Sequence, residues 1–270
     1  MHKRMEIFMV ICLFITSFVL ARKTAAIVSA QKASDPICVV IDAGHGGWDP
    51  GKVSASGALE KDINLALSLQ LKKKLEEHDI KVYLTRSDDN CLSDSKQEDF
   101  KERIALIEKV SPVLTISIHQ NSFTDSSVAG PQVFYYMTSS EGQNLAEILQ
   151  AELNNTLQPA SPRSIKSNDD YYLIKNTPTP TVIVECGFLS NPSEAALLCH
   201  AEYQNKISDA LCTGILSYLS STESVPSTEN SLSTETVLST ENSLSTETIL
   251  STENSLSTET LYSTEPEVME

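Results

Sequence analysis

The chain alternates between short, almost unbroken apolar runs and longer segments in which apolar residues recur every three or four positions. The short runs are typical of strands that are buried on both faces, and the wider spacing indicates amphipathic helices. The runs expected to form strands are 37–42, 80–85, 113–118, 131–137 and 181–184. The fourth run begins with Pro131, which favours an edge position because proline cannot donate a hydrogen bond to a neighbouring strand.

Helical spacing marks four segments that separate or follow these runs. They cover residues 63–77, 98–110, 142–157 and 201–219. Asp62 is expected to cap the first of them. Apolar strands that alternate with helices predict a sheet covered on both faces. Residues 35–220 are therefore expected to form a single three-layer α/β domain with a mostly parallel central sheet.

The N-terminal segment, residues 1–34, has the pattern of an export signal. Basic residues at positions 3 and 4 precede 14 uncharged, mostly apolar residues, Ile7 to Leu20. That run is short for a membrane-spanning helix, which needs about 20 residues, and suits a signal peptide. Two basic residues follow a possible cleavage site at Ala21, so an uncleaved membrane anchor stays open. A buried core helix is the disfavoured alternative. With either a signal peptide or an anchor, the rest of the chain is expected to act outside the cytoplasm.

The C-terminal segment, residues 221–270, differs from the rest in composition. From Ser227 a 12-residue unit repeats, beginning STENSLSTETVL, and the segment holds ten Glu and no Lys or Arg. With few apolar residues it is expected to be a disordered acidic tail. A short β-solenoid is the alternative because the period is fixed, but the segment has no glycine for the corners.

The net charge and the cysteine content exclude some classes of protein. The net charge is −16, and removing the ten tail Glu leaves 26 acids against 20 bases, a net of −6. No basic stripe is present, so nucleic acid is not an expected partner. The six cysteines lack C-x-x-C spacing, and a disulfide framework is not expected. Four are expected to be small buried hydrophobic residues: Cys38, Cys186, Cys199 and Cys212.

Three of the expected strands lead into chemically useful residues. The first runs into His45 in AGHGG, the third into His119 in ISIHQNS, and the last into Glu185 in VIVECGF. In parallel sheets, sites lie at the carboxyl ends of strands, so these three side chains are expected to converge.

This set suits a catalytic zinc site, which takes three protein ligands and keeps one position open. His45 and His119 supply two ligands, and Glu60, just before the first helix, can supply the third. Glu185 then has a separate role, as general base and general acid. Each residue also has a structural alternative: a hydrogen-bonded turn histidine, a carboxylate at a helix start, or a buried ion pair between Glu185 and Arg86. His78 and His200 are expected to be structural.

Five blocks in order resemble the zinc-dependent N-acetylmuramoyl-L-alanine amidases of the type 3 family. They are VIDAGHGGWDPG, GALEKDINLALSLQLKKKLE, VYLTRSDD, ISIHQNS and IVECGFLSNPSEAALL, within residues 37–219. The resemblance implies that His45, Glu60 and His119 bind one Zn²⁺ and that Glu185 is catalytic. It implies hydrolysis of the amide between N-acetylmuramic acid and L-alanine in peptidoglycan. Asn121 is a candidate substrate-binding residue.

Further stretches, such as GPQVFYY and YYLIKN, are most similar to the germination-specific members of spore-forming bacteria. That similarity implies trimming of stem peptides in the spore cortex, so that muramic lactam can form. Departures from the family pattern occur at Ala43, Gln120, Ser122 and Cys186, and substrate preference near Gln120 is open. A zinc peptidase acting within stem peptides and a non-catalytic wall-binding regulator are the alternatives.

Overall fold

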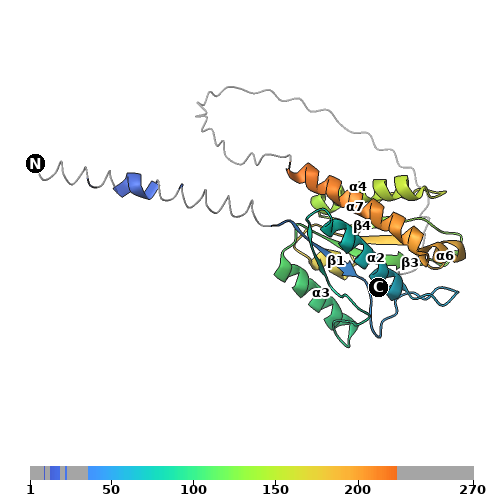
Figure 1. Ribbon diagram of the computed structural model, residues 1–270. Helices are drawn as coiled ribbons and strands as arrows, with labels where there is room; N and C mark the ends of the chain where they lie inside the picture. Colours follow the sequence, from blue (N-terminus) through green and yellow to red (C-terminus); the bar gives the residue numbers. More distant parts are fainter. Residues whose placement is uncertain (1–8, 10–12, 19–21, 23–35, 224–270) are drawn as a thin grey trace, which may run out of the picture. The chain divides into compact units, whose positions relative to one another are not determined.

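The computed structural model describes residues 9, 13–18, 22 and 36–223. Residues 36–223 form a six-stranded sheet with the strand order β2-β1-β3-β6-β4-β5, flanked by helices on both faces (Figure 1). The strands are β1 (Cys38–Ala43), β2 (Lys81–Leu84), β3 (Leu114–Asn121), β4 (Gln132–Tyr136), β5 (Lys166–Asn168) and β6 (Thr181–Phe188). The first four strands in this order run parallel, and β4 is antiparallel to β6. The predicted three-layer α/β fold with a mostly parallel sheet is confirmed.

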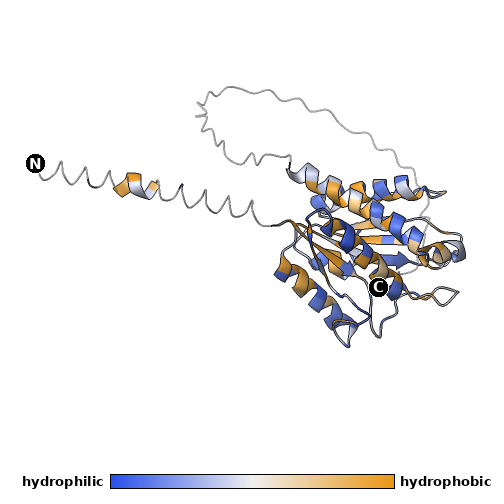
Figure 2. Cartoon of the chain, in the orientation of Figure 1, coloured by the Kyte–Doolittle hydropathy of each residue, from blue (hydrophilic) through white to orange (hydrophobic). Residues whose placement is uncertain are grey.

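The helices divide between the two faces of the sheet. One face is covered by α2 (Glu60–Glu76), α4 (Ser140–Leu157), α6 (Pro192–Leu198) and α7 (Ala201–Glu223). The other face is covered by α3 (Lys96–Val110) and α5 (Tyr172–Asn176). Figure 2 shows both apolar and polar colours along α3 and α7, as expected of helices with one buried side.

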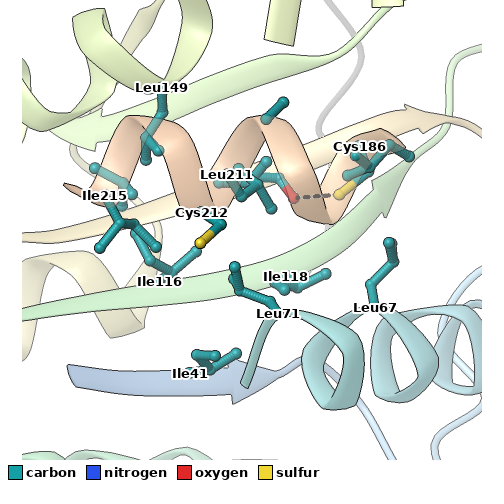
Figure 3. Close-up of a cluster of buried hydrophobic side chains, with 14 of the residues drawn as sticks. Ile41, Leu67, Leu71, Ile116, Ile118, Leu149, Cys186, Leu211, Cys212 and Ile215 are labelled. Atoms are coloured by element: carbon teal, nitrogen blue, oxygen red, sulfur yellow. Dashed lines mark hydrogen bonds between the residues drawn. The ribbon is translucent and has the colours of Figure 1, made fainter. Parts of the chain in front are cut away.

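Successive side chains of a strand point to opposite faces of the sheet and so pack into two different hydrophobic clusters. Val39 and Ile41 of β1 lie in the larger cluster, whereas Val40 between them lies in the cluster under α3. This is the period of two that a strand imposes on its side chains. Figure 3 shows the larger cluster, where Leu67 and Leu71 of α2 approach the sheet near Ile118. Burying one such side chain contributes about 1.5–3 kcal/mol.

Several expectations about individual elements are wrong. β4 is not an edge strand, because the three-residue β5 pairs with its outer side. Three short elements were not expected, because each is too short to show a periodic pattern of apolar residues: β5, α5 and α6. β3 and β6 run past their apolar stretches, so His119 and Glu185 lie inside strands. α2 begins at Glu60 and its N-cap is Leu59, with no side-chain cap, so Asp62 lies in the first turn instead.

The expectations for the cysteines are met only in part, and the described residues include little of the two terminal segments. All five described cysteines are free; Cys186 and Cys212 are buried as expected, whereas Cys199 is exposed and Cys38 is half-buried. The expected export segment lies almost entirely outside the described residues. So does the expected acidic tail, although α7 continues to Glu223, past the boundary expected at 220. None of the helices in the described part of the chain combines the length and apolar composition needed to cross a bilayer.

Candidate functional site

The residues singled out in the sequence meet at the carboxyl ends of β1, β3 and β6. His45 follows β1, His119 lies near the end of β3, and Glu60 is the first residue of α2. One potential ligand atom from each of these three residues lies within 4.8 Å of the others. The structure thus brings together two imidazoles and one carboxylate from three separate elements.

Glu60 is the centre of this cluster. Its Oε1 lies 3.2 Å from Nε2 of His45 and 3.1 Å from Nδ1 of His119. The same oxygen accepts a hydrogen bond from the backbone N–H of Gln120, and Oε2 accepts one from that of Lys52. Burial alone would raise the pKa of Glu60, but the hydrogen bonds with His119 and His45 outweigh it and hold that pKa well below its usual range. The carboxylate is therefore ionised and fixed in place.

His45 is oriented by Asp49, four residues later, which the sequence analysis did not identify. Nδ1 of His45 lies 2.8 Å from Oδ2 of Asp49, so Nε2 is the nitrogen that faces Glu60. Burial disfavours the charged imidazole, but the hydrogen bonds to Asp49 and Glu60 prevail and raise the pKa of His45 to about 10. The site therefore favours positive charge. A carboxylate behind a ligating histidine is the usual means of fixing its ring.

Two buried arginines hold the backbone that carries His45. Arg103 donates to the carbonyl oxygens of Ala43 and His45 at 2.9 and 2.7 Å, and to Oδ1 of Asp42 at 2.6 Å. Arg86 donates to the carbonyls of Ala43 and Gly44, and to two further backbone carbonyls. These contacts stabilise the left-handed conformation of His45, with φ of 60°, which a non-glycine residue seldom adopts. The hydrogen bonds of Arg86 thus go to backbone carbonyls, unlike the ion pair with Glu185 that was the alternative.

Gly44 makes room for His119. A Cβ atom at Gly44 would lie 2.3 Å from both Cε1 and Nε2 of the His119 ring. A glycine is required here because the backbone after β1 touches the imidazole of β3.

Glu185 lies beside the cluster on the next strand. It is directly in register with His119 on β3 and with Gln132 on β4, so the three side chains project from the same face of the sheet. Glu185 is buried, with 6% of its surface exposed. A register shift follows between His119 and Asn121; such bulges re-aim side chains next to active sites.

Asn121 and Gln120 differ in their surroundings. Asn121 is half-buried at the end of β3, and its Oδ1 accepts a hydrogen bond from the N–H of Ser122. Gln120 is buried and its Nε2 donates to Oδ1 of Asn64 on α2. Gln120 therefore supports the cluster from the side of α2. His78 and His200 are exposed and lie outside the cluster.

Comparison with known proteins agrees with this geometry. The sequence profile of the family described as N-acetylmuramoyl-L-alanine amidase matches residues 39–217. The germination-specific N-acetylmuramoyl-L-alanine amidase of Bacillus subtilis (strain 168) is 37% identical over 188 residues, which are 67% of this chain and 78% of that protein.

Solved structures show the same similarity. The CwlD amidase of Clostridioides difficile, in complex with the GerS lipoprotein, matches with a TM-score of 0.64 at 36% identity, covering 68% of this chain and 99% of that one. The catalytic domain of the CwlV amidase from Bacillus (Paenibacillus) polymyxa var. colistinus matches with a TM-score of 0.62 at 32% identity, covering 68% and 98%. The matched region contains every residue of the cluster, and the chain belongs to the N-acetylmuramoyl-L-alanine amidase family.

Proposed function

We propose that His45, Glu60 and His119 hold one zinc ion and that Glu185 moves the proton when the chain cleaves the amide between N-acetylmuramic acid and L-alanine. The observation that carries this proposal is the meeting of two imidazoles and a carboxylate within 4.8 Å, with Glu185 in register beside His119. The donor set fits the ion, because zinc accepts histidine nitrogen and carboxylate oxygen, and catalytic sites use three protein ligands.

The chain's own residues define the rest of the mechanism. A bound zinc ion supplies Lewis acidity, which polarises a carbonyl and makes water a better nucleophile near neutral pH. Asp49 keeps Nε2 of His45 directed at the cluster, and Glu60 contributes the negative charge that attracts a cation. Glu185 takes a proton from the attacking water and returns it to the nitrogen of the leaving L-alanine. Its burial next to His119 keeps this carboxylate away from bulk water.

The substrate is peptidoglycan, in keeping with the family. The similarity to a germination-specific amidase supports a role in the spore cortex, where removal of stem peptides precedes formation of muramic lactam. The chain then acts outside the cytoplasm, with residues 1–34 as signal peptide or anchor. The N-terminal residue of the protein recovered from the producing cells distinguishes a cleaved signal from a retained anchor.

The zinc assignment is tested on the purified full-length chain. His119→Ala is expected to lose zinc and activity together, whereas His200→Ala, which changes an exposed histidine outside the cluster, keeps both. Stoichiometric zinc in His119→Ala would overturn the ligand set.

Product analysis separates the amidase from its alternatives. Release of intact stem peptide, leaving a free lactyl carboxylate on muramic acid, identifies the amidase. Shortened peptides still attached to muramic acid would identify a peptidase. Binding to peptidoglycan with neither product would identify a non-catalytic regulator.

A further inference from the structure

Trp48 stands at the tip of a tight turn next to the candidate zinc site. The backbones of Gly46 and Asp49 exchange two hydrogen bonds of 3.0 Å, so Gly47 and Trp48 are the two turn residues between them. His45 directly precedes this turn, and Asp49 at its end orients the His45 ring. Two residues, Gly46 and Gly47, separate His45 from Trp48. Three Cα–Cα steps of about 3.8 Å therefore place their Cα atoms at most about 11 Å apart.

The turn is fixed from several sides. The N–H of Gly47 donates to the carbonyl of Asp89, and the carbonyl of Gly47 accepts from Nζ of Lys61 at 2.8 Å. Gly47 has a φ of 54°, and a Cβ there would lie 2.9 Å from Sγ of Cys91. The indole Nε1 of Trp48 donates to the carbonyl of Ser93 at 2.9 Å. The ring is thus held by its one polar atom and by the turn beneath it.

Trp48 nevertheless remains 49% exposed. Single exposed apolar residues are common on protein surfaces and usually need no explanation. Trp48 differs because its ring is ordered in advance, on the turn that also orients a candidate metal ligand. A side chain held in its binding conformation loses little conformational entropy when a ligand covers it.

We propose that the exposed face of Trp48 binds a sugar ring of the glycan strand. The inference rests on the proposed function, because it requires the muramic-acid amide to lie at the His45 cluster. A pyranose ring presents a face of C–H groups, which packs on an aromatic face, while its hydroxyl groups stay in water at the edge. The amide that is cleaved hangs from muramic acid, and the turn that carries Trp48 directly follows the candidate ligand His45. A sugar of the same strand can therefore reach the indole when the amide lies at the cluster.

Fluorescence gives a direct test, because Trp48 is the only tryptophan in the chain. The probe is a peptide-free tetrasaccharide of alternating N-acetylglucosamine and N-acetylmuramic acid, added to the full-length protein. A saturable blue shift of the emission is expected as the sugar displaces water from the indole. A free stem tripeptide is expected to cause no shift. No shift with the tetrasaccharide, or a shift with the tripeptide alone, would overturn the inference.

Kinetics on glycan strands that carry stem peptides supply the second test. Trp48→Ala is expected to raise KM about tenfold, equivalent to about 1.4 kcal/mol of binding, and to affect kcat much less. Trp48→Phe, which keeps an aromatic face, is expected to recover most of the loss. Val113→Ala changes an exposed apolar residue just before β3, at the opposite end of the sheet, and serves as the control.

The two variants separate this inference from the proposed function. Unchanged KM in Trp48→Ala would refute the sugar contact while leaving zinc binding and amide cleavage intact. Equal losses in Trp48→Ala and Trp48→Phe would also count against stacking, because the hydrogen bond to Ser93 is absent from both.

Discussion

Replacing Gly44 by alanine adds one methyl group, which would point into the candidate metal site. The new Cβ would lie 2.3 Å from Cε1 and Nε2 of His119. Ordinary contacts between such atoms begin near 3.5 Å, so the ring must retreat by about 1 Å. The ring is buried on β3 and bonded to Glu60, so this movement breaks existing contacts.

The magnitude follows from the geometry of zinc. Zinc–nitrogen bonds are about 2.0–2.1 Å long and tolerate deviations of only about 0.2 Å. A displaced ring should therefore weaken zinc binding by at least the 10–100-fold typical of changes that misorient a ligand. Forcing an extra methyl group into a packed site should also cost about 1–3 kcal/mol of stability.

The assay measures zinc affinity by competition with a chelator, together with a thermal melt and amide cleavage. Gly57→Ala is the matched control. Gly57 has a φ of 89°, so alanine is strained there, but a Cβ would have no atom within 4 Å. Gly57→Ala should lower stability by about 1–2 kcal/mol and leave zinc affinity unchanged.

Wild-type zinc affinity and activity in Gly44→Ala would refute the argument that this glycine is needed for the position of His119. A variant that loses stability but keeps zinc affinity would show that the strain is absorbed elsewhere in the turn.

Three further predictions concern the proton shuttle, the tail and acid stability. Glu185→Gln should keep its zinc content and lose activity by about 10²–10⁴-fold; a folded, zinc-loaded and fully active variant would remove Glu185 from the mechanism. Truncation after Glu223 should leave turnover on purified peptidoglycan unchanged, since residues 224–270 are too poor in apolar side chains to add to a core; a large fall at unchanged stability would refute this. Burial raises the pKa of Asp42, but Arg103 and the hydrogen bond from Ser117 prevail and lower it from 3.8 to about 2. Asp42 should thus contribute about 2 kcal/mol above pH 4, and denaturant titrations should show this contribution lost as pH falls through 2. Ser117→Ala should flatten that loss, and an unchanged slope would count against the assignment.

The hydrophobic pattern was sufficient to predict the fold class and the end of the sheet at which the candidate site residues come together. The apolar runs before His45, His119 and Glu185 are local features, and parallel strands place their carboxyl ends at one edge. Glu60 was predicted to be the third ligand because the helix after the first strand begins near the same edge of the sheet. These inferences need only the order of the elements along the chain.

Tertiary packing decided what the pattern leaves open. β3 and β6 extend beyond their apolar runs because backbone pairing continues through His119 and Glu185, and pairing depends on the neighbouring strand. The three-residue β5 is stabilised as a strand by its backbone pairing with β4.

The support of the site is also a product of packing. Arg103 reaches the carbonyl of His45 across 58 positions of sequence, so only packing of α3 against the sheet creates that hydrogen bond. Packing also explains Gly44. Only the position of His119 in the folded structure shows that residue 44 has no room for a side chain. Periodicity reports which face of an element is buried, whereas the fit of one residue against another depends on distances that no local pattern encodes.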